Sequence, residues 1–265
     1  MKAVPVRTRR TDRTPQESKV AVAAPTLSRQ LLQHCCLASL CMLIILWVEL
    51  SLIADPADKT NLAQMILMTL LPWLVICWLS WKGLPDHPHA RFGAANVLTL
   101  YRAAGTVLLA GWIPVVSQLP PPGLALLSLC SVLLLTLDGL DGYLARRTHL
   151  ASAFGARFDM EIDALLTLVI SVLVWQSGKT GIWILLLGLM RYGFVLAGVV
   201  CTALDNPLFP SFRRKLICVV QLATLCAILS PWVSPPWSTA LGMVACLLLS
   251  ASFVRDTHWL LTRPS

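Results

Sequence analysis

One short stretch of this chain concentrates acidic residues in a sequence otherwise dominated by apolar side chains. Five of the thirteen Asp and Glu residues lie in it: Asp138, Asp141, Asp159, Glu161 and Asp163. Inserting one carboxylate into hydrocarbon costs roughly 2.5–3.5 kcal/mol, and neighbouring carboxylates also repel one another. A divalent cation with oxygen ligands neutralises such a group well, so the stretch is the candidate active site.

The spacing of the four aspartates predicts two shared helix faces. Asp138 and Asp141 are three residues apart, which places both on one face of an α-helix. Asp159 and Asp163 are four apart and share a face in the same way. Counting outward from a hairpin midpoint near Leu150 brings Asp141 level with Asp159, and the same count brings Asp138 level with Asp163. Two antiparallel helices would thus present four carboxylates to one space, as one or two hard cations require.

Small and basic residues surround these acids. Gly142, Ala145 and Gly155 would let helix backbones or a flat ligand come close. Arg146 and Arg157 add positive charge that would hold an anionic substrate. Phosphoryl transfer needs neutralised phosphate oxygens, an aligned hydroxyl and one carboxylate that takes its proton. The residues therefore favour that reaction type.

The composition predicts an integral membrane protein. The 265 residues are 57% hydrophobic and only 13% charged, with a mean hydropathy of +0.73. The nine cysteines include no C-x-x-C pair, so they do not suggest a zinc site. Apolar runs bounded by Pro, Gly and charge predict eight spans. They are Leu31 to Ile53, Leu62 to Trp81, Val97 to Gln118, Gly123 to Ala145, Phe154 to Gln176, Ile182 to Ala203, Lys215 to Pro231, and Trp237 to Phe253.

The distribution of Lys and Arg predicts an orientation. Most basic residues fall on one side of the predicted spans, in the N-terminal tail and in the linkers 82–95, 146–153 and 204–214. The opposite linkers contain just Lys59 and Lys179. By the positive-inside rule, the side that carries the carboxylates is cytoplasmic. The net charge of +8 does not indicate nucleic acid, because seven of the twenty-one basic residues lie in the first thirty positions, whose composition predicts a disordered tail.

These residues together resemble the signature of the CDP-alcohol phosphatidyltransferase family. Asp138-x-x-Asp141-Gly142-x-x-Ala145-Arg146, eight residues, then Gly155-x-x-x-Asp159-x-x-x-Asp163 matches all eight fixed positions. The stretch Asn96-x-Leu98-Thr99-x-x-Arg102 is similar to the family's first core helix. The resemblance implies an all-α integral membrane protein whose six-helix catalytic core, 96–254, is preceded by two additional transmembrane helices within 31–81. A basic disordered cytoplasmic tail (1–30), a cytoplasmic linker (82–95) and a cytoplasmic C-terminal tail (255–265) complete the expected organisation.

The resemblance also implies roles for the site residues. One or two Mg²⁺ or Mn²⁺ ions would be held by Asp138, Asp141, Asp159 and Asp163, with Asp163 also acting as the catalytic base. The nucleotide would lie along Gly142, Ala145 and Arg146, with Asn96 and Thr99 near it.

The implied reaction belongs to phospholipid biosynthesis. The hydroxyl of a small alcohol would attack the phosphate of a CDP-linked lipid, most often CDP-diacylglycerol in bacterial relatives, and CMP would leave. The expected location is the bacterial inner membrane, among its lipids, with the active site and both termini cytoplasmic. A homodimer is implied as well.

Four further basic residues have two interpretations. Arg191 lies deep in the sixth predicted span and needs a partner there. That partner is either a carboxylate that makes a structural tie or an anionic group of the acceptor. Arg213, Arg214 and Lys215 either bind a phosphate or anchor the cytoplasmic side. The binding interpretation favours a phosphorylated polyol as the acceptor.

The polar residues of the core permit a structural interpretation beside the catalytic one. Asn96 could cap its helix, and Arg102 could snorkel to the surface. The aspartates could serve only as helix caps and arginine partners, or the chain could be an inactive lipid- or nucleotide-binding homologue. A cation- or proton-coupled transporter is the rival of another class, but it predicts acids spread across the membrane depth rather than near one surface. The first two spans look like an accessory unit.

Overall fold

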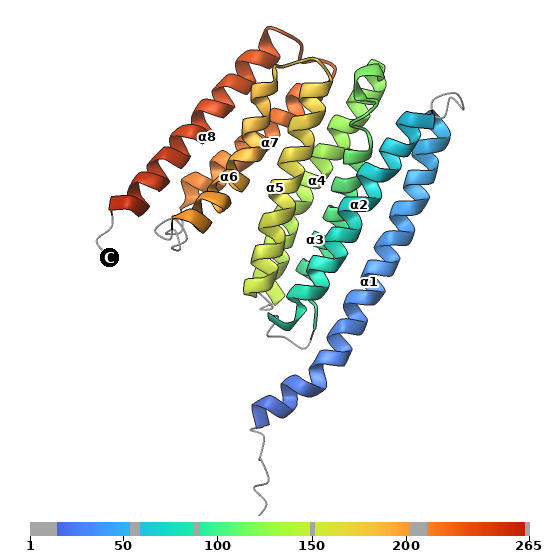
Figure 1. Cartoon of the computed structure of the whole chain (residues 1–265), viewed down its shortest axis with the longest axis vertical. Coiled ribbons are helices and arrows are strands. Elements are labelled where there is room, and N and C mark those ends of the chain that lie inside the picture. The colour runs from blue at the N-terminus through green and yellow to red at the C-terminus, as the bar shows by residue number, and fades with distance from the viewer. Residues whose placement is uncertain (1–14, 54–58, 87–90, 149–151, 202–210, 263–265) are drawn as a thin grey trace, which may run out of the picture.

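The computed structural model describes residues 15–53, 59–86, 91–148, 152–201 and 211–262, and these residues form helices and no strand. The long helices run roughly side by side (Figure 1). They are α1 Pro15–Ile53, α2 Lys59–Gly83, α3 Ala94–Gly111, α4 Pro121–Thr148, α5 Ala153–Gln176, α6 Leu186–Val200, α7 Phe212–Leu229 and α8 Trp237–Thr262, with 3-10 turns η1 Leu84–Asp86, η2 Val116–Gln118 and η3 Ile182–Leu185.

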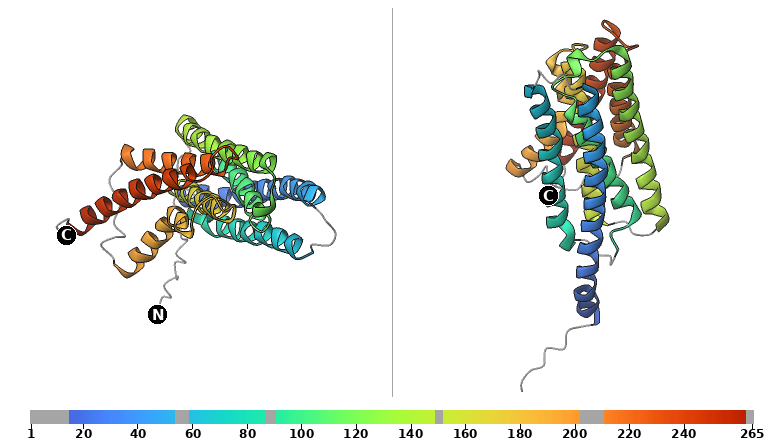
Figure 2. Two further views of the ribbon diagram at one scale, coloured as in Figure 1. Left: turned by 90° about the horizontal axis from the view of Figure 1, so that it is seen from above. Right: turned by 90° about the vertical axis from the view of Figure 1, so that its right-hand side faces the viewer.

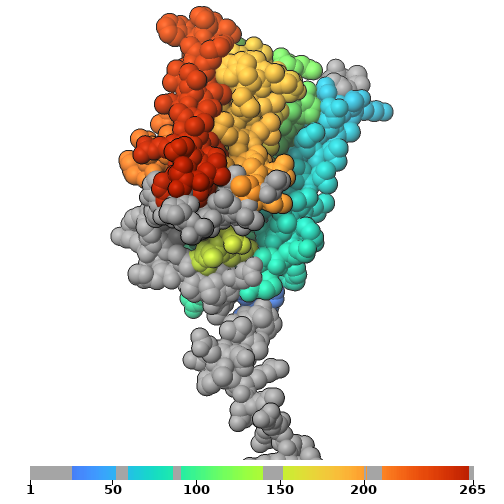
Figure 3. All heavy atoms as spheres, turned by 60° about the vertical axis from the view of Figure 1, so that its left-hand side comes forward, coloured from blue at the N-terminus to red at the C-terminus, as the bar shows by residue number. Residues whose placement is uncertain are grey.

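The predicted all-α membrane fold is confirmed. Each predicted span corresponds to one long helix, and five segments of the described chain are long and apolar enough to cross a membrane. They are Thr26–Ser51, Lys59–Gly83, Pro121–Gly139, Ile182–Val199 and Trp237–Thr262. Large apolar side chains on the outer helices, such as Trp47, Leu74 and Leu247, are exposed, as lipid-facing residues would be. The space-filling view shows α8 and α2 at opposite sides of one face, with the α5–α6 segment between them (Figure 3).

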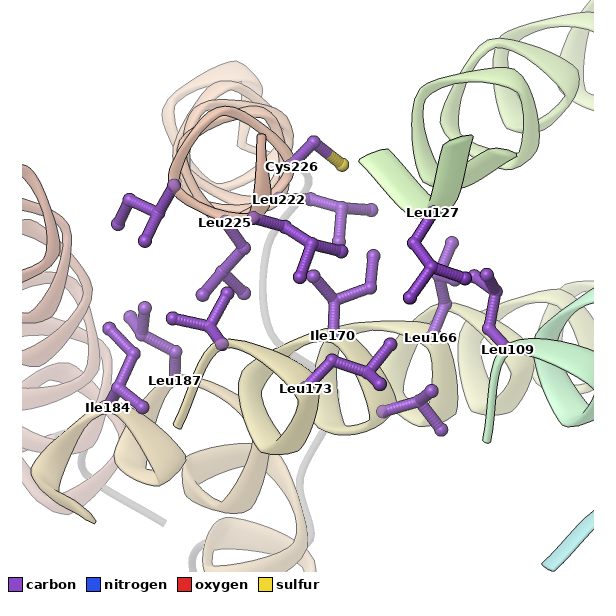
Figure 4. Packing of buried hydrophobic residues seen from close by; sticks show 14 of the residues in the cluster. Leu109, Leu127, Leu166, Ile170, Leu173, Ile184, Leu187, Leu222, Leu225 and Cys226 are labelled. Carbon is purple, nitrogen blue, oxygen red and sulfur yellow. The ribbon is translucent and has the colours of Figure 1, made fainter. Parts of the chain in front are cut away.

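Helix α5 forms the centre of the bundle. Leu166, Ile170 and Leu173 on this helix are fully buried. They pack in one cluster with residues of α3, α4 and α7, among them Leu222 and Leu225 (Figure 4). Because α5 also carries Asp159 and Asp163 near its start, the packed half of the helix fixes the position of the acidic half.

The accessory helices α1 and α2 pack directly on the predicted catalytic core. They lie beside α3 in two views (Figures 1 and 2). A second buried cluster combines Met42 of α1, Trp73 of α2 and Leu100 of α3 with Ile162 of α5. The two helices of the pair are joined by a hydrogen bond of 2.8 Å from Trp73 Nε1 to Ser39 Oγ.

Both predicted tails are shorter than expected. Helix α1 begins at Pro15, inside the segment 1–30 that we predicted to be disordered, and it extends beyond the other helices (Figure 1). The physical reason is that Leu27 and Leu31 are buried against neighbouring helices, which stabilises this part of α1. Helix α8 continues to Thr262, into the predicted tail 255–265. Residues 1–14 and 263–265 lie outside the described residues.

Lys179 is one of the two basic residues on the side of the membrane where few are expected, and its contacts explain its position. This side chain is 9% exposed and donates to the carbonyl oxygens of Ile228 at 3.0 Å, Leu229 at 3.2 Å and Ser230. These carbonyls end α7, where a helix leaves its acceptors unpaired and favours a cation. Lys179 therefore caps α7 and does not contradict the charge asymmetry.

Candidate active site

The predicted helical hairpin brings three of the four aspartates together. Helix α4 ends at Thr148 and α5 starts at Ala153, where Ser152 caps it by accepting a 3.0 Å hydrogen bond from the Gly155 N–H. Carboxylate oxygens of Asp138, Asp159 and Asp163 lie within 4.8 Å of one another. The predicted proximity of Asp138 and Asp163 is thus present.

The remaining residues of the α4 signature are described only through their backbone. Asp141, Gly142, Ala145 and Arg146 all lie within helix α4, as the spacing predicts. Their side chains lie outside the described residues, so their expected roles stay predictions.

Arg102 of α3 occupies the centre of the carboxylate cluster. Its side chain is 0% exposed. Nη1 donates to Asp159 Oδ1 at 2.7 Å, and Nη2 lies 3.0 Å from Asp138 Oδ1 and also donates to Asp163. The prediction that Arg102 snorkels to the surface is wrong, because three carboxylates inside the bundle hold its guanidinium.

The charge of this cluster suits a divalent cation. With its carboxyl groups ionised, the set of Arg102 and its three acidic partners carries a formal net charge of −2. The three acids are between 26% and 39% exposed, so a ligand can reach them. Carboxylate oxygens are the ligands that Mg²⁺ and Mn²⁺ prefer. Arg102 alone does not balance the acids, and their donor set fits a hard cation.

Asn96 and Thr99 lie on the buried face of α3, nearly two turns and about one turn before Arg102, respectively. Asn96 does not cap this helix, since Gly93, with a φ of 83°, is the N-cap residue. The Asn96 side-chain amide instead donates to the Phe92 carbonyl at 2.6 Å. A Cβ on Gly155 would lie 2.5 Å from Asn96 Oδ1. Gly155 thus allows a close approach of α5 to α3, which is a packing role for this signature glycine.

Arg191 on α6 pairs with a carboxylate, one of the two partners expected for it. Its Nη2 donates to Glu161 Oε1 on α5. Glu161 lies two residues from both Asp159 and Asp163, about 200° around the helix, so it faces away from the carboxylate cluster. The pair is partly exposed, at 28% for Arg191 and 54% for Glu161.

Arg213 and Arg214 both face the buried carboxylate of Asp256 on α8. Arg213 donates to Asp256 Oδ1 at 2.8 Å and to Ser252 Oγ at 2.9 Å. Arg214 Nη1 lies 3.8 Å from Asp256 Oδ2. Arg213 and Arg214 lie in the first turn of α7, where the helix dipole disfavours cations. The carboxylate of Asp256 compensates for this unfavourable interaction. Lys215, the next residue, is exposed.

Cys218 lies in the vicinity of the carboxylate cluster and of two of the basic residues. This residue of α7 lies close enough to Asp163, Asp138, Arg191 and Arg214 for their charges to act on it. Its side chain is exposed. The acids and two of the four predicted acceptor-binding residues therefore border the same part of the molecule.

Three charged residues of this region have partners that the sequence did not indicate. Arg102, Glu161 and Asp256 each form an ion pair with a residue at least thirty positions away. A signal for Arg102 existed: it follows Asn96 and Thr99 at helical spacing, which places a charge on the buried face of an apolar helix. No comparable pattern marks Asp256.

Comparison with known proteins assigns the family. The model of the family described as CDP-alcohol phosphatidyltransferase matches residues 92–252, which is more than half of the chain and includes Arg102 and all four aspartates. The comparisons with curated proteins and with solved structures each found no match. The family match, the helical hairpin and its carboxylates agree, and the chain belongs to the CDP-alcohol phosphatidyltransferase family.

Proposed function

We propose that this protein transfers a phosphatidyl group from a CDP-linked lipid, CDP-diacylglycerol, to the hydroxyl of a small alcohol and releases CMP. The observation that carries the proposal is the cluster of Asp138, Asp159 and Asp163 inside the segment that matches the family. The reaction would take place in phospholipid biosynthesis, at the cytoplasmic face of a bacterial inner membrane.

The acids supply two functions in this proposal. Asp138, Asp141, Asp159 and Asp163 would hold Mg²⁺ or Mn²⁺, which would neutralise the phosphate oxygens of the substrate when bound. Asp163 would also accept the proton of the attacking hydroxyl. It lies at the partly exposed edge of the cluster, with 39% of its side chain exposed, where an acceptor could reach it.

Arg102 would keep the acids in place before and during the reaction. It bridges α4 and α5 by contacting Asp138 on one helix and Asp159 and Asp163 on the other. A guanidinium fixes carboxylates through directed hydrogen bonds. The relative positions of the two halves of the signature would therefore depend on this residue of α3.

The nucleotide would lie along the α4 side of the hairpin. Gly142, Ala145 and Arg146 would line this position, as the signature implies for the family. Asn96 and Thr99 would support the nucleotide from α3, where both side chains are buried. Asn96 lies directly beside Gly155.

The acceptor would bind on the side of Cys218, between the carboxylates and the basic residues. Arg191, Arg214 and Lys215 would supply positive charge there, because Arg191 and Arg214 lie within electrostatic range of Cys218. Arg213 is held by Asp256 and Ser252, so it would support the pocket from behind. An acceptor with a phosphate group is the expectation that this set of residues favours.

The direct test is CMP release by the purified full-length protein. The protein would be given CDP-diacylglycerol and a panel of alcohols, including glycerol, glycerol 3-phosphate, inositol, inositol phosphate, serine and choline, with Mg²⁺ or Mn²⁺. We expect CMP release with one class of acceptor, its loss with a chelator and its return on adding metal. Absence of CMP release with every acceptor, in protein that binds Mn²⁺, would contradict the proposal.

A further inference from the structure

The start of α5 is held by a cluster of side chains that comes largely from outside the six-helix core. Phe154, in the first turn of α5, is buried together with Leu27 and Leu31 of α1, Leu84 of η1 and Phe92, which precedes α3. The rings of Phe92 and Phe154 have centroids 6.4 Å apart. We call these five residues the Phe154 cluster.

The accessory helices enclose Phe154 tightly. Gly83, the last residue of α2, lies so close that a Cβ there would be 2.7 Å from Phe154 Cε2 and 2.9 Å from Cδ2. From α1, the Gln30 side-chain oxygen accepts a hydrogen bond of 3.0 Å from the Phe92 N–H. Both accessory helices thus contact the residues that surround the Phe154 ring.

The cluster continues to the acids of the site. The Phe158 ring stacks on Phe154, with centroids 5.9 Å apart and an interplanar angle of 16°. Phe158 is followed directly by Asp159, which Arg102 contacts at 2.7 Å. Ile162, which precedes Asp163, is 3% exposed and packs in the cluster that contains residues of α1 and α2.

We infer that α1 and α2 are part of the catalytic architecture, and that Gly83 and Leu31 are positioning residues for the carboxylates of α5. The inference rests on the proposed function for the identity of the ligand, but its geometry stands without it. A side chain that displaces the Phe154 ring would move the first turns of α5 relative to α3. The distances from Asp159 and Asp163 to Arg102 and to a bound cation would then change.

Gly83→Ala tests the contact from α2. The added methyl group would collide with the Phe154 ring, which cannot turn aside freely because Phe92 and Phe158 pack against it. We expect Mn²⁺ affinity, measured by calorimetry in detergent, to fall about tenfold, the lower limit for losing a partner that orients metal ligands. Hydrogen exchange over residues 153–163 should become faster. Gly193→Ala is the matched control, since a Cβ on this helical glycine would meet nothing within 4 Å.

A double variant separates this effect from a general loss of structure. In a Phe154→Leu background the ring is absent, so adding Gly83→Ala should change Mn²⁺ affinity and hydrogen exchange little further. Such non-additivity is the expected mark of two residues in direct contact. Equal effects of Gly83→Ala with and without the ring would overturn the assignment of Gly83.

A second pair of variants tests the contact from α1. Leu31 is 1% exposed in the Phe154 cluster, whereas the next residue, Leu32, is 54% exposed. Leu31→Ala should weaken Mn²⁺ binding and speed exchange over 153–163, and Leu32→Ala should do neither.

The two hypotheses fail in different ways. Failure of the wild-type protein to release CMP would count against the proposed function and leave the exchange measurement as the test of positioning. Exchange over 153–163 that is unchanged in both Gly83→Ala and Leu31→Ala would overturn the inference, even in an active enzyme.

Discussion

Arg102 on α3 donates a hydrogen bond of 2.7 Å to Asp159 on α5, across 57 positions of sequence. The same guanidinium contacts Asp138 on α4, so one buried residue holds three helices at the site. The acids of the signature therefore depend on a helix that contributes no carboxylate to the cluster.

Replacing Arg102 by Met should destabilise the protein and abolish activity. Removing one partner of a buried ion pair costs about 3–5 kcal/mol, and we expect the lower end because the carboxylates are partly exposed. The change would appear as a lower unfolding midpoint in detergent. Arg157→Met, at an exposed position of α5, should leave the midpoint nearly unchanged. An Arg102→Met protein with wild-type stability would show that the ion pairs contribute nothing.

Asp163→Asn should abolish CMP release while CDP-lipid binding stays measurable. The amide cannot accept the proton of the acceptor hydroxyl, but it keeps the size of the side chain. Removal of one general base lowers a rate by about 10²–10⁴-fold. Turnover and lipid binding would be measured on the same preparation. Turnover close to wild type would exclude Asp163 as the base.

Arg191→Gln and Glu161→Gln should change the acceptor requirement in opposite directions. The first variant removes a cation from the acceptor side, so KM for an anionic acceptor should rise more than KM for the CDP-lipid. The second removes the carboxylate that now neutralises Arg191, so KM for the same acceptor should fall. Equal changes in both KM values for both variants would instead identify the pair as a structural tie between α5 and α6.

Asp256→Asn should loosen the contact between α7 and α8. The carboxylate is 5% exposed and pairs with Arg213, so the change leaves a cation without its partner in the first turn of α7. A loss of stability of about 3 kcal/mol is expected. The double variant Arg213→Gln/Asp256→Asn should recover part of it, because neither charge is left alone. Strictly additive losses would show that the two residues do not interact.

Local spacing explains why the sequence predicted the carboxylate hairpin. Asp159 and Asp163 share a helix face whatever surrounds them, because an α-helix repeats every 3.6 residues. A short connection makes α4 and α5 antiparallel, so the proximity of Asp138 to Asp163 also followed from counting. The long helices of the described residues could be predicted from apolar runs bounded by Pro, Gly and charge, and five of these segments are long and apolar enough to cross a membrane.

Contacts between distant helices could not be predicted in this way. In a membrane, the lipid-facing and protein-facing sides of a helix are both apolar, so hydropathy does not show which neighbours a helix has. The sequence suggested an accessory role for α1 and α2, yet the structure packs Leu31 and Gly83 around Phe154. The sequence likewise permitted two interpretations of Arg191 and did not indicate Glu161 as its partner.

The sequence by itself determined the family, the helical membrane fold and the acids of the signature, because all three are recorded in local composition and spacing. Only the tertiary structure decided that Arg102 lies among those acids, that Asp256 holds Arg213, and that the accessory helices support the start of α5. The physical reason is that each of these contacts joins helices far apart in the chain, and its geometry exists only once the whole bundle has packed.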